Sequence, residues 1–472
     1  MALVLLAGCG SSAPKLPRGG PTLRLTVPLI PRTLDPAKVA DLSSLNVTHE
    51  LYAGLTRFSG TGVVPDLAES WDVSRGGLVW TFHLRKGIRW SDGRAITAED
   101  FRRAWRRALD PRTKAPLAGP DLGIVRGARS FHATGSGELG VEAPNERTLR
   151  VTLQHPVPWF DQLAAYPISF PSSSRASSGP FRLASQSSGG LGLERNAEYW
   201  NASAVKPRRI VLTTSTKRTD GILPRGLAPP GLPWIETAKL PTGPGWKPLQ
   251  TLSVQLLWIV TRRPALADPD FRRFIAQAVG DATMDGLVPF ALPSHDVITN
   301  GVTIVVAGPP TRVRLTLAYT TQDPHAAAVV RATTDKLEKA GSSITPIAFP
   351  TIGQLLQAAG PPPRSDIDLV LLGWSSKVFD AYNVFDLFPC TSAFNVSQLC
   401  DHSYDRLMRR AVRTLDDRKR YELERSILQK LRDSAPAVPL SDQREYVLLK
   451  PGVRGFSWSP LGFYELMGMT RS

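Results

Sequence analysis

The 472-residue sequence is poor in cysteine and lacks any long apolar run. Three cysteines are too few for a small scaffold held by many disulfides. No Cys-x-x-Cys or His-x-x-x-His pair offers the ligand spacing of a zinc site. No segment approaches the roughly 20 consecutive apolar residues that a membrane-spanning helix needs. We therefore expect no metal ion, no cofactor and no transmembrane helix.

Motifs that carry catalytic chemistry are also missing. The sequence has no Gly-x-x-x-x-Gly-Lys-Ser/Thr phosphate loop and no Gly-x-Ser-x-Gly nucleophile elbow. Its one Gly-x-Gly-x-x-Gly, at residues 135–140, lies in a polar stretch without the strand and helix that dinucleotide binding requires. The seven histidines are scattered without ligand spacing. We expect a protein that is not an enzyme.

The composition that remains is that of a globular chain, with 42% hydrophobic and 21% charged residues. One hydrophobic core stops growing near roughly 250–300 residues, so at least two domains are expected. The net charge of +16 favours polyanions in general. However, the arginines are dispersed, and the densest cluster repeats at helical spacing, which is typical of the solvated face of one helix: Arg102, Arg103, Arg106 and Arg107. We expect no nucleic-acid partner.

The N-terminus carries a short apolar stretch that ends at a cysteine. Residues 2–8 read ALVLLAG and precede Cys9, and Leu6 to Cys9 resemble a bacterial lipobox, whose cysteine is lipidated. Residues 10–21 then form a flexible tether. We expect a protein outside the cytoplasm, anchored to the outer face of the cytoplasmic membrane through lipidated Cys9.

Cys390 and Cys400 are the two other cysteines, ten residues apart. An exported chain occupies an oxidising compartment, so a disulfide between them is expected.

Strand and helix patterns alternate in the last third of the chain, with strands at 313–319, 344–349 and 367–372 and helices at 325–340, 404–415 and 418–433. Pro346 confines the middle strand to a sheet edge. Earlier, Thr97 and Asp100 are spaced as a capping box for a helix that ends near Leu109. This order indicates a mixed or parallel sheet covered by helices.

Five segments in one order carry a resemblance to a known family: 31–36, 51–55, 64–71, 80–93 and 97–101, which read PRTLDP, LYAGL, VPDLAESW, WTFHLRKGIRWSDG and TAEDF. Together they resemble the family-5 extracellular solute-binding proteins, the peptide, dipeptide and nickel binders of ABC transporters. The segments SGPFRL at 178–183, RNAEYW at 195–200, LFPC at 387–390 and APAVPL at 435–440 extend the resemblance almost to the end of the chain.

The resemblance implies an α/β chain with a two-lobe periplasmic-binding-protein-like fold (type II), with mixed sheets flanked by helices and an extra inserted domain. We expect signal, lipobox and tether at 1–21, lobe I at 22–45, 170–252 and 446–472, an inserted domain II at 46–169, and lobe II (domain III) at 253–445. The lobes would close on a small solute, expected to be a peptide, and a monomer would deliver it to ABC permease and ATPase subunits.

The resemblance also places the ligand-binding residues. The stretch after Gly373 and the turn at 178–180 supply the candidates: Trp374, Ser375, Ser376, Lys377, Asp380, Tyr382, Asn383, Ser178, Gly179 and Pro180. Trp374 would form a ligand wall, or would pack between the lobes. Family members carry an aspartate for the peptide ammonium at the position of Lys377.

Lys377 would repel an ammonium group, which leaves three alternatives. The ligand lacks a free amine and carries an anion at that end, or the loop is shifted so that Asp380 reaches the amine, or Lys377 points to solvent. The departure also keeps a second function open, that of a non-transport lipoprotein with a structural or regulatory role in cell-envelope glycolipid synthesis.

Overall fold

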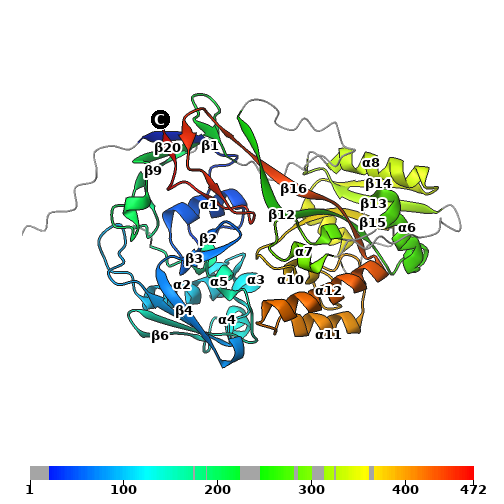
Figure 1. The fold of residues 1–472 in the computed structure, drawn as a ribbon, viewed down its shortest axis with the longest axis horizontal. Coiled ribbons are helices and arrows are strands. Elements are labelled where there is room, and N and C mark those ends of the chain that lie inside the picture. The colour runs from blue at the N-terminus through cyan, green and yellow to red at the C-terminus, as the bar shows by residue number, and fades with distance from the viewer. Residues whose placement is uncertain are drawn as a thin grey trace, which may run out of the picture.

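The computed structural model describes residues 21–173, 176–187, 189–223, 245–280, 285–299, 313–323, 326–360 and 366–472, without the side chains of 441–443. A ten-stranded mixed sheet extends through the molecule (Figure 1). Its strands, in spatial order, are β14 (Ser343–Phe349), β13 (Arg314–Thr320), β15 (Leu369–Ser375), β12 (Trp246–Ile259), β16 (Ala437–Leu449), β11 (Gly221–Ile222), β1 (Thr22–Thr26), β10 (Arg209–Thr213), β9 (Gly190–Arg195) and β8 (Phe181–Ser187).

A second sheet of four antiparallel strands lies near the N-terminal end of this large sheet. Its strands, in spatial order, are β4 (Ala68–Ser74), β5 (Val79–Leu84), β7 (Thr148–Thr152) and β6 (Val141–Asn145). Three two-stranded ladders complete the described strands: β2 (Thr56–Ser59) with β3 (Gly62–Pro65), β17 (Val453–Arg454) with β20 (Thr470–Arg471), and β18 (Ser457–Trp458) with β19 (Tyr464–Glu465).

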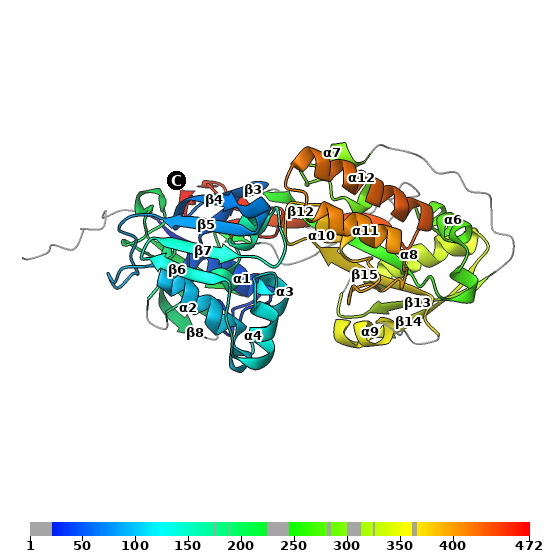
Figure 2. The ribbon, with the colours of Figure 1, turned by 90° about the horizontal axis from the view of Figure 1, so that it is seen from below.

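The helices fall into two groups, one on each side of the molecule (Figure 2). The N-terminal group comprises α1 (Leu42–Leu51), α2 (Ala98–Leu109), α3 (Ala118–Leu122), α4 (Ala128–Thr134) and α5 (Phe160–Leu163). The C-terminal group comprises α6 (Pro269–Val279), α7 (His295–Ile298), α8 (Ala326–Lys339), α9 (Ile352–Ala359), α10 (Tyr382–Phe385), α11 (His402–Ala411) and α12 (Asp417–Ser434). Among the helices of the described residues, none combines the length and the apolar character needed to cross a bilayer.

Two long strands, β12 and β16, connect the two sides. We call residues 21–223 with 450–472 the N-lobe and residues 256–437 the C-lobe. The end of β16 pairs with β11 of the N-lobe on one side and with the start of β12 on the other, whereas the rest of β12 also pairs with β15 of the C-lobe. The ladder between β12 and β16 is irregular between Gln250 and Val254 and again before Leu256. A β-bulge bends its strand, so the connection is deformed where the chain passes between the lobes.

The predicted α/β fold class is confirmed, as are several local predictions. The capping box forms, because Asp100 accepts a hydrogen bond from the backbone N–H of Thr97 at 2.8 Å. Strand β14, which contains Pro346, is at the edge of the sheet. The arginines of α2 lie on its surface, where Arg102 and Arg103 pair with acids one turn away.

Strand β16, which has 13 residues, was not predicted from the sequence, because Pro436 and Pro439 are typical of the end of a strand. Pro439 lies opposite Leu256, next to the second ladder irregularity, where a missing N–H removes little. The predicted inserted domain at 46–169 contains the four-stranded sheet and α2 to α5, and the predicted lobe boundaries fall on β12 and β16. These boundaries stay a prediction.

Candidate functional site

The loop that follows β15, residues 376–386, forms one of the contacts between the C-lobe and the N-lobe. Three interactions join it to the segment around α5. The Tyr166 hydroxyl donates to the Lys377 carbonyl at 2.7 Å, and the Phe379 N–H donates to the Gln162 side-chain oxygen at 2.6 Å. The rings of Trp159 and Tyr382 have centroids 5.0 Å apart. The predicted ligand residues after Gly373 therefore lie at the junction of the lobes.

Lys377 forms an ion pair with the N-lobe. Its ammonium lies 2.8 Å from Oδ1 of Asp121 in α3. The Asp121 side chain is only 4% exposed, and burial raises the pKa of its carboxyl while Lys377 opposes that rise. The Lys377 side chain is 37% exposed, so the lysine is partly in contact with solvent. The loop is also fixed by Asn383, whose side-chain oxygen accepts the Lys377 backbone N–H at 2.9 Å.

Asp380 is directed into the C-lobe and away from the junction. It is 2% exposed, and its carboxylate accepts a hydrogen bond from Nε of the buried Arg420 at 2.9 Å. It also accepts the backbone N–H of Tyr382. In this arrangement a peptide ammonium would have to displace Arg420 to reach Asp380. In this structure Asp380 is therefore not placed to bind a peptide ammonium in place of the family aspartate.

The end of β15 carries Trp374 and two serines. Trp374 is half-buried, its ring centroid lies 5.3 Å from that of Phe394, and its indole N–H has no hydrogen-bond partner among the described residues. The Ser375 hydroxyl is 2.7 Å from that of Ser253 on β12. Ser376 is buried, and its backbone N–H donates to a carbonyl of β12. This end of β15 is thus attached to the strand that connects the lobes.

The turn at residues 178–180 has a structural environment of its own at the C-terminal end of α1. The N–H groups of Ser178 and Gly179 donate to the Leu51 carbonyl, and the Ser178 hydroxyl accepts the N–H of Ala53. The Pro180 carbonyl accepts the backbone N–H of Asn196. These groups bond within the N-lobe, and a contact between this turn and a ligand stays a prediction.

A cavity of about 660 Å³ lies in the N-lobe between α2, β8 and the loop after β1. Its lining is mostly polar and includes Tyr52, Ser91, Ser177 and the ion pair between Asp35 and Arg107. No residue of the loop after β15 lines it.

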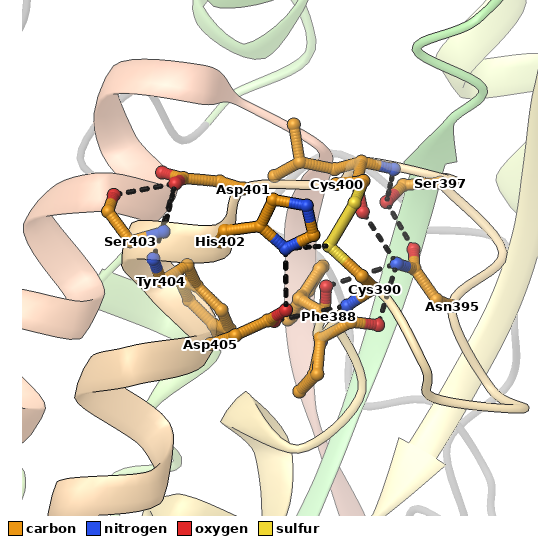
Figure 3. The surroundings of a disulfide bond; sticks show 12 residues. Phe388, Cys390, Asn395, Ser397, Cys400, Asp401, His402, Ser403, Tyr404 and Asp405 are labelled. Carbon is orange, nitrogen blue, oxygen red and sulfur yellow. Dashed lines mark hydrogen bonds and ion pairs between the residues drawn. A yellow bond between two sulfur atoms is a disulfide. The ribbon is translucent and has the colours of Figure 1, made fainter.

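Cys390 and Cys400 are joined in a disulfide, which closes the loop that carries Phe394 (Figure 3). Asn395 holds this loop from inside, since its amide donates to the carbonyls of Phe388, Pro389 and Leu399. Cys9, the predicted lipidation site, lies outside the described residues.

Residues 62–284 match the bacterial extracellular solute-binding proteins, family 5, in the middle region of that family. Over this region, somewhat less than half of its length, the chain is similar to the family-5 solute-binding proteins. Members of this family bind solutes without changing them, in agreement with the expectation that the chain is not an enzyme. The family is extracytoplasmic.

The chain is 43% identical over 150 residues to the probable deoxycholate-binding periplasmic protein YgiS of Escherichia coli, a match that covers 30% of the chain but only 27% of that relative's length. It is 26% identical to di/tripeptide-binding protein 1 of Pseudomonas aeruginosa, with 92% of each chain covered. Its fold is similar to the structure of clavulanic acid biosynthesis oligopeptide binding protein 2, with a TM-score of 0.81, 21% identity and 96% of each chain covered.

Sequence reasoning missed the N-lobe residues of the junction. Asp121 is 256 positions from Lys377 in the sequence. An aspartate in the first turn of a short helix is already explained by the helix dipole, so the sequence gives no reason to expect an ion pair with a distant lysine. Gln162 lies in α5 (Phe160–Leu163) and Tyr166 lies three residues beyond its end.

Proposed function

We propose that this chain is the substrate-binding component of an ABC importer, which captures a peptide or a related small solute between its lobes and delivers it to a membrane permease. The observation that carries the proposal is the connection of the two lobes by β12 and β16, with ladder irregularities where the chain crosses. A two-strand connection with local bends permits hinge motion of packed bodies. The family match and the named relatives support the same role.

The chemistry at Lys377 favours a ligand without a free ammonium at this position. Asp121 neutralises the ammonium from the buried side only, so the exposed side of the junction still presents donors of a cation. A carboxylate or another acceptor fits there, whereas an ammonium would be repelled. The named relatives include binders of di- and tripeptides and of deoxycholate, and deoxycholate is a carboxylate that has no amine.

The decisive experiment is native mass spectrometry of the protein purified from its own host, followed by thermal-shift measurements with whatever co-purifies. A ligand that binds only the folded state raises Tm, and at 100 times its Kd it contributes about 2.7 kcal/mol. Matched pairs of peptides with free and acetylated N-termini test the ligand class. Stabilisation by acetylated peptides or carboxylates supports the proposal, and preference for free-amine peptides contradicts the role of Lys377.

Membrane attachment through Cys9 is part of the same proposal. The full-length chain should fractionate with membranes and incorporate labelled palmitate in a bacterial host, and the Cys9→Ser variant should do neither. Labelling that persists in Cys9→Ser would contradict the anchor.

A second candidate function is a structural or regulatory role in cell-envelope glycolipid synthesis. It is favoured by the same ion pair, since Lys377 stands at the position that the resemblance assigns to the ammonium-binding aspartate and is paired with Asp121 of the chain itself. A deletion strain separates the two functions. Loss of solute uptake supports transport, whereas normal uptake with altered envelope lipids supports regulation.

A further inference from the structure

The surroundings of the disulfide contain a third soft ligand, His402. Its Nδ1 lies 3.8 Å from the sulfur of Cys390, and the ligand atoms of Cys390, Cys400 and His402 all lie within 4.8 Å of one another. Figure 3 shows the imidazole between the disulfide and the carboxylate of Asp405. We propose that the reduced form of this site, with Cys390, Cys400 and His402 as ligands and Asp405 as the fourth, binds a zinc ion. This proposal does not depend on the transport function.

The separations suit a tetrahedral metal site. With metal bonds of about 2.3 Å to sulfur and about 2.0 Å to nitrogen, a thiolate and an imidazole on one zinc ion lie about 3.6 Å apart. Cys390 and His402 are already at 3.8 Å. An imidazole nitrogen and a carboxylate oxygen on one ion lie about 3.3 Å apart, and Nδ1 of His402 is 3.6 Å from Oδ2 of Asp405. The two sulfurs must separate to about 3.8 Å once their bond is broken.

The supporting shell is in place. His402 and Asp405 lie one turn apart on α11, so the same face of the helix presents both. The other carboxylate oxygen of Asp405 accepts the backbone N–H of Cys390 at 3.1 Å, which fixes its direction. The N-terminus of α11 favours the negative charge of thiolates beside it. Two thiolates with one imidazole are a donor set that selects zinc over harder cations.

The disulfide is accessible to a reductant in solution. Cys400 and His402 are exposed and Cys390 is half-buried, and a cavity of about 340 Å³ lined by both cysteines lies beside them. An external dithiol would attack the Cys400 sulfur and release the Cys390 thiolate next to His402. The second thiol of the reductant then attacks the first sulfur of the reductant, which is bonded to Cys400 in the mixed disulfide, and releases the Cys400 thiolate. The dithiol loses two electrons and two protons and becomes a disulfide, while the protein gains two thiols, whose protons leave when zinc binds.

Sequence spacing gave no sign of this site, because Cys400 and His402 form a Cys-x-His pair and the sequence has no Cys-x-x-Cys. Zinc would keep the loop closed after the disulfide has opened. This loop places Phe394 against Trp374, so its closure maintains the aromatic contact at the end of β15.

The test is a zinc titration of the full chain in its oxidised form and after anaerobic reduction with a phosphine that is then removed. A chromophoric chelator reports free zinc, and cobalt serves as a second probe because thiolate ligands give it a charge-transfer absorption. The reduced protein should bind one equivalent of zinc at least about 100-fold more tightly than the oxidised protein. Equal affinity of the two forms would overturn the proposal, and this comparison needs no variant.

Variants then assign the ligands. His402→Asn should weaken zinc binding of the reduced chain by about 10-fold to 100-fold. The matched control is His83→Asn, which changes an exposed histidine that also pairs with a carboxylate but has no cysteine nearby. The double variant Cys390→Ser, Cys400→Ser should lose the cobalt charge-transfer absorption. Unchanged affinity in His402→Asn, or retained absorption in the double serine variant, would contradict the site.

Discussion

The ammonium of Lys377 and the carboxylate of Asp121 lie 2.8 Å apart and join the C-lobe to the N-lobe by an ion pair. The pair is asymmetric, because the acid is buried and the lysine is partly in water. A buried carboxylate without a cation carries a large desolvation cost, whereas an exposed ammonium without its partner is solvated. Asp121 therefore depends on Lys377 more than Lys377 depends on Asp121.

This asymmetry predicts a double-mutant result. Lys377→Met should lower the free energy of unfolding at pH 7 by about 1–2 kcal/mol, less than a fully buried pair would lose because Lys377 is partly exposed. The variant Lys377→Met, Asp121→Asn should recover at least half of that loss, since no charge is left buried. Urea unfolding measures both values.

The control for that cycle is Arg112→Met. Arg112 pairs with Asp110 but is 87% exposed, so its loss should leave the free energy of unfolding almost unchanged. If the double variant at 377 and 121 were as unstable as Lys377→Met, the two groups would not be coupled.

Asp380 has a structural role that can be tested apart from ligand binding. Asp380→Asn should destabilise the protein by about 2–4 kcal/mol, because Arg420, with 5% of its side chain exposed, loses its buried carboxylate. Burial, and after it the charge of Asp380, raises the pKa of Glu424 well above its ordinary value. When residue 380 is neutral, Glu424 can ionise and restore part of the lost stability. Asp417→Asn removes the 69% exposed partner of the same arginine and should cost less than about 0.5 kcal/mol. Equal effects of the two substitutions would contradict this assignment.

The parts of the fold that could be predicted are those with a local cause. The helix α2 was predicted because its capping residues and its apolar face lie within one short segment, and the edge position of β14 followed from one proline. Strand β16 could not be predicted in the same way. Pro439 within it and Pro436 just before it argue against a strand, and the reason that it forms is a ladder with β12 nearly 200 residues earlier in the chain.

The candidate site shows the same limit. The segment from Trp374 to Asn383 could be located from its motif, but its partners could not, because Asp121, Gln162 and Tyr166 come from a separate part of the chain. The charge of Lys377 was visible in the sequence, whereas the acid that neutralises it was visible only in three dimensions.

Gly179 predicts a steric effect that is separate from any ligand contact. A Cβ at this position would lie 2.7 Å from the carbonyl carbon of Leu51 and 2.8 Å from the nitrogen of Tyr52, and backbone atoms cannot move aside as a side chain can. Gly179→Ala should therefore destabilise the protein by about 2–3 kcal/mol in thermal or urea unfolding. Gly62→Ala, in β3 with nothing within 4 Å of the added carbon, is the matched control and should be neutral. A neutral Gly179→Ala would show that this turn is free to shift.

His49 should make the protein sensitive to acid. Its ring is buried among Phe58, Phe170 and Phe463, and this burial, together with the charge of Arg57, lowers its pKa to about 3. The unfolded chain binds the proton near pH 6.5, so the contribution to stability is complete above that pH and is lost as the pH falls toward 3. Between pH 6.5 and 4.5 the loss is about 2–3 kcal/mol.

His49→Gln cannot take up the proton in either state, so its urea midpoint should fall less steeply over this range than that of the parent protein. Parallel curves for His49→Gln and the parent protein would mean that His49 is protonated equally in the folded and unfolded states, and would contradict this prediction.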